Sequence, residues 1–302
     1  MILVTDYMRN DIDGVACVYA YSEFLKKNDA DAEGGIFGKP HSESRFVMDR
    51  FGIRVGNADK LIGSCSGIIL VDASDLRGIS PKIEPGKVVE IIDHRKLNDA
   101  DRFPNAKVQI ELVGSAATLV AERFKKSKVP ISKQSAAILA CAIISNTVNF
   151  KAGVTTNRDR AAFKWLNSKA KITSGFIHKM FAHKSRFNLR KEFTGGFASF
   201  TFGNGRVGIA QLEIIGAERF VNNNSQKINN LLRRMKKEKN LDYAFLTCID
   251  VEKGINVFLS IDDKTERLLS PILKLKFENG TAKRKGVIMR KEITPLIKER
   301  FE

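Results

Sequence analysis

The sequence has few of the features that mark secreted, metal-knot or membrane proteins. Among its 302 residues it has only four cysteines and no C-x-x-C pair, which argues against a zinc knot or a dense disulfide framework. No apolar run reaches the length of about 18 residues that suits a membrane helix. An acidic residue within the first six positions argues against a signal peptide. We therefore expect a cytoplasmic protein with no membrane partner and with reduced cysteines in its core: Cys17, Cys65, Cys141 and Cys248.

The chain carries a large excess of positive charge. Its 51 Lys and Arg residues against 34 Asp and Glu residues give a formal net charge of +17. Such a balance suits nucleic acids, acidic membrane surfaces, or small anions such as phosphates and polyphosphates. The basic residues are scattered, with one denser cluster at residues 233–239, so no isolated basic arm indicates nucleic-acid binding. Charge alone does not choose among these partners.

Two secondary-structure patterns divide the sequence near residue 187. In the first part, apolar runs at 2–5, 67–71 and 87–92 alternate with helical patterns at 14–27, 115–125, 132–144, 158–168 and 174–183. This alternation predicts an α/β domain, a parallel sheet with helices on both faces, over residues 1–186. Strand patterns at 196–202, 206–212, 243–249 and 255–260, with one long helix at 225–239, predict a smaller α+β domain over residues 187–302. The linker is expected within residues 184–191.

Polar side chains gather where the predicted strands end. Asp11 and Asp13 follow the first strand, Asp72 ends the second, and Asp93-His94-Arg95 ends the third. Because open α/β sheets place their sites at the carboxyl ends of strands, three segments can deliver these groups to one crevice. Carboxylates with an imidazole suit Mn²⁺ or Mg²⁺, and two such ions about 4 Å apart can activate a shared water. For any single acid, a plain turn is the alternative interpretation.

The order of these motifs resembles the DHH phosphoesterase superfamily. The segments Asp11-Ile12-Asp13, Val71-Asp72, Asp93-His94-Arg95 and Gly114-Ser115-Ala116-Ala117-Thr118 follow one another as that superfamily's motifs do. Residues 143–151 and 155–159 are similar to the fourth motif of manganese-dependent inorganic pyrophosphatases and exopolyphosphatases. Residues 207–213 and 286–291 resemble the DHHA2 domain of the same enzymes. The resemblance therefore covers nearly the whole chain.

This resemblance implies a role for each matching residue. It implies one or two ions of Mn²⁺ or Mg²⁺, with Co²⁺ also suitable, and an active site in the cleft between the two domains. The implied metal ligands are three carboxylates and one imidazole: Asp11, Asp13, Asp72 and His94. The residues implied to take part in catalysis are Asp72, Asp93, His94, Arg95 and Asn146. The implied contacts to substrate phosphates are Arg95, Ser115, Lys191, Arg290 and Lys291.

Three positions depart from the superfamily pattern. Tyr7 stands where a metal-binding histidine is usual, and a phenol with a pKa of about 10 is a poor ligand for a hard ion, which weakens one metal site. Arg95 replaces a histidine, as in the Prune-type exopolyphosphatases, and its planar fork can hold a phosphate but cannot act as a general acid. Asn146 replaces an aspartate, so the metal affinity should fall.

The favoured function is metal-dependent hydrolysis of phosphoanhydride bonds in pyrophosphate or short-chain polyphosphate, with water as the nucleophile. One alternative is a phosphodiesterase acting on nucleotides or short oligonucleotides, against which the DHHA2-like ending argues. Another is a catalytically impaired relative that binds polyanions. We expect pyrophosphate, polyphosphate or another small phosphate anion as the partner rather than nucleic acid, and a homodimer is compatible with the resemblance.

Overall fold

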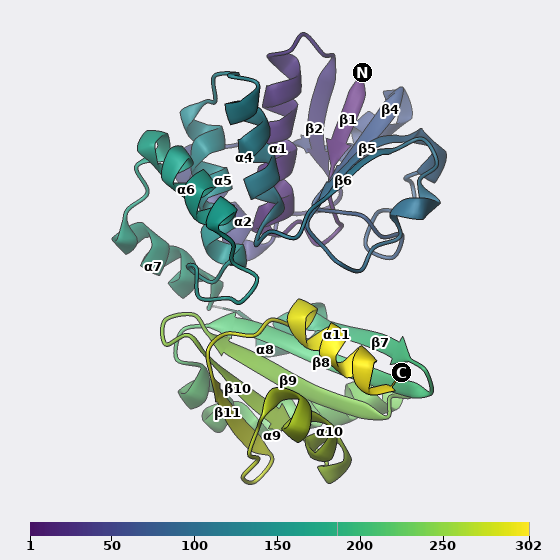
Figure 1. The fold of residues 1–302 in the computed structure, drawn as a ribbon, viewed down its shortest axis with the longest axis vertical. Helices are drawn as coiled ribbons and strands as arrows, with labels where there is room; N and C mark the ends of the chain where they lie inside the picture. Colours follow the sequence, from purple (N-terminus) through teal and green to yellow (C-terminus); the bar gives the residue numbers. More distant parts are fainter. Residues whose placement is uncertain (186, 302) are drawn as a thin grey trace. The chain divides into compact units, whose positions relative to one another are not determined.

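The computed structural model describes residues 1–185 and 187–301, and the chain forms two compact units (Figure 1). The first unit comprises residues 1–150 and 154–183, and the second comprises residues 151–153 and 184–302. None of the helices in the described residues is long and apolar enough to cross a membrane.

The first unit is built on a parallel sheet. Within the described residues this sheet has six strands in the order β3-β2-β1-β4-β5-β6, and each neighbouring pair is parallel. All five residues of the central strand β4 are buried, as expected for a strand covered on both faces. The strands are β1 (Ile2–Thr5), β2 (Ala32–Ile36), β3 (Gly56–Asn57), β4 (Gly67–Val71), β5 (Val88–Asp93) and β6 (Lys107–Ile110).

Helices lie on both faces of this sheet, as the sequence predicted. The long helices α1 and α4 cover one face, and α5 packs against both of these helices (Figure 1). The other face is covered by the short helix α3 and by loops, whose side chains Ile79, Ile83 and Phe103 pack in one cluster with Leu3 and Ile68. The α-helices of this unit are α1 (Ile12–Lys26), α2 (Ser42–Phe51), α3 (Ala58–Leu61), α4 (Ala116–Lys126), α5 (Lys133–Asn146), α6 (Asn157–Ala170) and α7 (Ser174–Lys184), and the 3-10 turns are Ile62–Ser64, Pro85–Lys87 and Ala100–Arg102.

The second unit is a mixed sheet with helices on both faces, which confirms the predicted smaller α+β domain. In the described residues its five strands have the order β11-β10-β9-β8-β7, and only the β8–β9 pair is parallel. The strands are β7 (Phe197–Phe202), β8 (Gly205–Ile214), β9 (Tyr243–Asp250), β10 (Ile255–Ser260) and β11 (Thr281–Lys285). The helices are α8 (Leu189–Gly196), α9 (Ala217–Glu238), α10 (Asp263–Leu273) and α11 (Arg290–Phe301).

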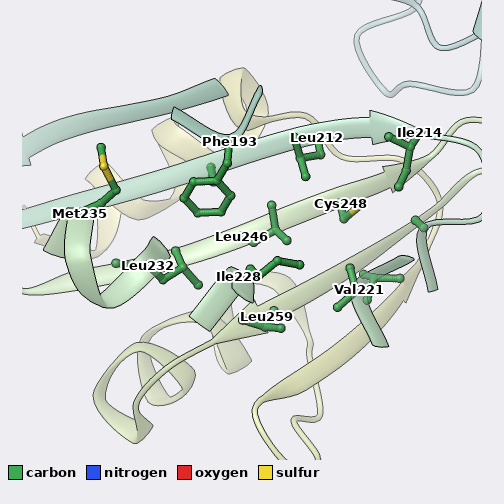
Figure 2. Packing of buried hydrophobic residues seen from close by; sticks show 14 residues of the cluster. Phe193, Leu212, Ile214, Val221, Ile228, Leu232, Met235, Leu246, Cys248 and Leu259 are labelled. Carbon is green, nitrogen blue, oxygen red and sulfur yellow. The ribbon is translucent and has the colours of Figure 1, made fainter. Parts of the chain in front are cut away.

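Alternation along the strands builds two cores in the second unit. Leu212 and Ile214 of β8, with Leu246 and Cys248 of β9, face α8 and α9, as Figure 2 shows. Val207 and Ile209 of β8 and Phe245 of β9 pack on the other side, with residues of α10 and α11. Because successive side chains of a strand point to opposite faces, the period of two in the sequence is sufficient to produce both layers.

Some details of the sequence prediction were wrong. The long helix begins at Ala217 rather than at residue 225, since Val221 of its first turns packs in the core. The polar residues that follow Val221 interrupt the apolar pattern, so the sequence did not indicate this start. Cys65 is only half-buried, whereas Cys17, Cys141 and Cys248 are buried, and all four are free thiols. The segment expected to be a linker is partly helical, since α7 runs to Lys184 and α8 starts at Leu189.

Candidate metal centre

Three predicted metal ligands meet at the carboxyl edge of the parallel sheet. Asp72 follows β4, His94 follows β5, and Asp13 lies in the first turn of α1. Each offers one ligand atom, and these atoms lie within 4.8 Å of one another. All three side chains are buried. Two carboxylates and one imidazole form a donor set that suits a hard divalent ion such as Mn²⁺.

The imidazole of His94 is oriented by its second nitrogen. Nδ1 lies 2.9 Å from the carbonyl oxygen of Val113, to which it can donate its proton. Nε2 then presents its lone pair toward Oδ1 of Asp72 at 3.3 Å and Oδ2 of Asp13 at 3.7 Å. This arrangement fixes the tautomer that a metal ligand requires.

Asp93 holds the backbone turn from which His94 projects. Its Oδ1 accepts the backbone N–H of His94 at 2.6 Å, and its Oδ2 accepts the hydroxyl proton of Ser74. The side chain is completely buried. Asp93 therefore acts here as a positioning residue, and Ser74 is a supporting residue that the sequence patterns did not single out.

The start of helix α4 binds the carboxylate of Asp13. The hydroxyl of Ser115 donates to Oδ1 at 2.7 Å, and the backbone N–H groups of Ala116 and Ala117 donate to Oδ2 and Oδ1 at 2.9 Å each. The side-chain amide of Asn146 donates to Oδ2. The anion recognised by this helix start in the structure is thus the protein's own carboxylate, and Ser115 and Asn146 both donate to Asp13, a residue of the candidate metal group.

The carboxyl group of Asp13 should make the metal-free protein pH-sensitive. Burial first, and then the charge of Asp72, raise the pKa of Asp13 to about 7, although Ser115 and His94 lower it. Because the unfolded pKa is about 3.9, the free energy of unfolding should fall as the pH rises from about 4 to about 7 and then level off. Thermal unfolding of metal-free protein across this range measures the effect, and Asp13→Asn should flatten that part of the profile. An unchanged slope in Asp13→Asn would contradict the assignment.

Asp11 is not one of the three residues in the clustered group. Its Oδ1 accepts the backbone N–H groups of Asp13 at 3.1 Å and of Gly14 at 3.2 Å, so it caps the N-terminus of α1. The residue is exposed, and its charge contributes to the raised pKa of Asp13. A cap of this kind stabilises a helix by about 1 kcal/mol.

Asp6 is a buried acid that the sequence patterns missed. It is 1% exposed, and within the described residues neither of its carboxylate oxygens has a hydrogen-bond partner. Burial, followed by the charges of Asp11 and Asp72, raises its pKa well above the ordinary value. Asp6 directly follows β1, so the same strand-end signal that marked Asp72 could have found it.

The backbone adopts left-handed conformations just after strand β4 and just after helix α5. Asp72 has φ of +54°, and Val148, Asn149 and Phe150 have φ of +51°, +52° and +63° directly after α5, which ends at Asn146. A left-handed conformation costs most residues with a side chain about 1–2 kcal/mol, and Asn and Asp adopt it more readily than the others. Such strain concentrates at functional sites because the surrounding structure maintains it there.

Asp159 connects helix α6 to the loop that holds Asp13. Its carboxylate accepts the backbone N–H of Gly114 at 2.9 Å, the hydroxyl of Thr118 at 2.6 Å, and the backbone N–H and hydroxyl of Thr156 at 2.7 Å each. The side chain is completely buried, and it forms a capping box with Thr156. Asp159, which lies in the motif at residues 155–159, therefore has a structural role.

Replacing Asp159 with alanine should destabilise the first unit by about 3–5 kcal/mol, because buried donors would lose their acceptor. Urea unfolding followed by the fluorescence of Trp165, the single tryptophan of the chain, measures this loss within α6 itself. The exposed Asp101→Ala is the matched control and should change the unfolding free energy by less than about 0.5 kcal/mol. Equal effects of the two substitutions would contradict the role of Asp159.

The predicted phosphate contacts of the second unit lie on two of its helices. Lys191 is exposed in the first turn of α8, and Lys291 is half-buried in the first turn of α11. Arg290, the first residue of α11, donates from its guanidinium to the carbonyl oxygens of Gly196 and Ile209. Arg290 therefore also supports the packing of its own unit.

A parallel sheet with acids and a histidine at its strand ends is typical of metal-dependent enzymes. Residues 1–143 match the family described as the DHH family, N-terminal domain, and over these residues the chain is similar to that family. This match confirms the resemblance drawn from the motifs of the first part of the chain.

The particular relatives are manganese-dependent inorganic pyrophosphatases. The chain is 27% identical, over 98% of its length and 97% of the relative's, to a probable manganese-dependent inorganic pyrophosphatase of Bacillus velezensis. It is 26% identical to the manganese-dependent inorganic pyrophosphatase of Bacillus subtilis, with the same coverage. A Methanococcus jannaschii structure assigned to the family II inorganic pyrophosphatases is also similar, with a TM-score of 0.81 and 26% identity. The match covers 100% of this chain and 99% of the Methanococcus chain. An exopolyphosphatase-related protein of Bacteroides fragilis, at 13% identity and a TM-score of 0.51, shares the fold.

Proposed function

We propose that this protein hydrolyses inorganic pyrophosphate to orthophosphate with a divalent cation, Mn²⁺ before Mg²⁺ or Co²⁺. The observation that carries the proposal is the buried group of Asp13, Asp72 and His94, whose ligand atoms lie within 4.8 Å of one another. Full-length similarity to manganese-dependent inorganic pyrophosphatases supports pyrophosphate as the substrate. The fold shared with an exopolyphosphatase-related protein supports no particular substrate, so short polyphosphate remains a secondary candidate.

The residues of the first unit prepare this site for a cation and a phosphate. An ion held by these ligands would supply Lewis acidity to phosphate oxygens and to an attacking water. Val113 and Asp93 keep Nε2 of His94 directed at the ligand cluster, and Ser115 and Asn146 hold the carboxylate of Asp13 in place. Arg95, always protonated, supplies a fixed positive charge beside Asp72.

The second unit contributes cations for the phosphate groups under the same proposal. We assign it to the DHHA2 type on the motif at residues 286–291, and we assign phosphate binding to Lys191, Arg290 and Lys291. Because Arg290 also binds carbonyl groups of its own unit, its truncation would mix folding with binding. Lys291→Gln is the cleaner substitution, and it should raise KM for pyrophosphate more than it lowers kcat.

The experiment that tests the proposal is phosphate release from pyrophosphate, tripolyphosphate and a cyclic dinucleotide with Mn²⁺, Mg²⁺ or Co²⁺. Fastest release from pyrophosphate with Mn²⁺ is expected, and the cyclic dinucleotide should remain uncleaved. Cleavage of the dinucleotide alone would support the phosphodiesterase alternative. Tight polyphosphate binding without any turnover would support the impaired polyanion binder.

A further inference from the structure

The guanidinium group of Arg95 contacts both an aromatic ring and a carboxylate of the candidate metal centre. Its central carbon is 3.9 Å from the centroid of the Tyr7 ring, a cation–π contact. Nη2 of the same group lies 3.4 Å from Oδ1 of Asp72. Arg95 thus approaches the same oxygen of Asp72 that lies 3.3 Å from Nε2 of His94.

Tyr7 is held in this position and is not available as a metal ligand. Its hydroxyl donates to Oδ2 of Asp75 at 2.5 Å, and burial raises the pKa of the phenol above its ordinary value. A methyl group on Gly78 would come within 2.0 Å of the Tyr7 ring, so the backbone at Gly78 packs directly against it. The ring is therefore a fixed platform beneath the guanidinium.

The surroundings of Arg95 favour a permanent positive charge. Although burial acts to lower the pKa of Arg95, the negative charges of Asp72, Asp93 and Asp11 raise it above its ordinary value. A divalent ion on this side of Asp72 would have to approach a charged guanidinium in a site where charge repulsion is poorly screened. In the described part of the chain, Asp72 belongs to a single group of acids and histidines that could hold a metal ion. That group is Asp13, Asp72 and His94.

We propose that the guanidinium of Arg95 is the built-in second cation of this centre, so that each chain binds one divalent ion, at Asp13, Asp72 and His94. The arginine supplies a positive charge that a second ion would otherwise bring to the substrate phosphate, and this half of the inference rests on the proposed function. The fork geometry of a guanidinium also suits two oxygens of one phosphate group.

The number of bound ions tests this inference without any substrate. Equilibrium dialysis with Mn²⁺ and metal analysis should give one ion per wild-type chain, and the electron paramagnetic resonance spectrum should show uncoupled Mn²⁺. The double variant Tyr7→His with Arg95→Gln removes the charge and adds an imidazole, and it should bind two ions with a spin-coupled spectrum. Arg95→Lys keeps the charge and should still bind one ion.

Lys96→Gln is the matched control, because it removes one positive charge from the neighbouring exposed position. It should leave the count at one. Two ions of similar affinity in the wild-type chain would overturn the inference and direct attention to Asp6 and Asp11 as further ligands. If the wild-type chain binds one ion but does not hydrolyse pyrophosphate, the proposed function is wrong and this inference stands. If it binds two ions and hydrolyses pyrophosphate, the proposed function stands and this inference is wrong.

Discussion

Replacing Asp72 with alanine is expected to abolish tight Mn²⁺ binding and to lower kcat/KM for pyrophosphate by about 10³-fold or more, since a metal supplies several kcal/mol of transition-state stabilisation. Asp72 is the residue of the trio that also contacts Arg95, so its removal would take a carboxylate both from the ligand group and from the guanidinium. Mn²⁺ titration calorimetry and phosphate release measure the two losses separately.

The backbone at Asp72 requires a second substitution. Its φ of +54° favours asparagine over alanine, so Asp72→Asn removes the charge while tolerating the left-handed conformation. Both substitutions should lose metal binding, and Asp72→Asn should keep more of the unfolding free energy. Undiminished turnover in Asp72→Asn with a folded protein would show that the centre lies elsewhere.

Replacing Asn146 with aspartate is expected to tighten Mn²⁺ binding by about tenfold or more and to raise turnover, because ligand charge count sets the affinity of oxygen sites. The amide of Asn146 donates to Oδ2 of Asp13, which is one of the three clustered residues. A carboxylate in its place would repel Asp13 until a cation is bound. The metal-free variant should therefore unfold at a lower temperature than the wild type, and added Mn²⁺ should raise its Tm by a larger amount.

Asn149→Asp is the matched control for this change. It lies three residues along in the same segment, is half-buried like Asn146 and undergoes the same chemical change. Metal titration and thermal unfolding of both variants, with and without Mn²⁺, separate a ligand effect from a general effect of added negative charge. Equal responses of the two variants would contradict a place for Asn146 in the metal centre.

Local sequence patterns predicted the fold class and the three residues of the candidate metal group. The apolar runs of the first part are buried parallel strands, and the period of two in the second part gives a sheet covered on both faces. Asp72 and His94 could be found because a residue that ends a strand of a parallel sheet must lie at its carboxyl edge. Asp13 could be found because the chain returns into a helix within a few residues of that edge.

Tertiary structure decided what the remaining side chains do. Ser115 binds Asp13 from 102 residues away, and Tyr7 donates to Asp75 across 68 residues. Periodicity reports which face of an element is buried, but it carries no information about which polar groups meet when two distant segments pack. For that reason the fold class and the residues of the candidate metal group could be predicted from the sequence. Only the folded chain showed Arg95 stacked on Tyr7 and Asp159 supporting the loop that holds Asp13.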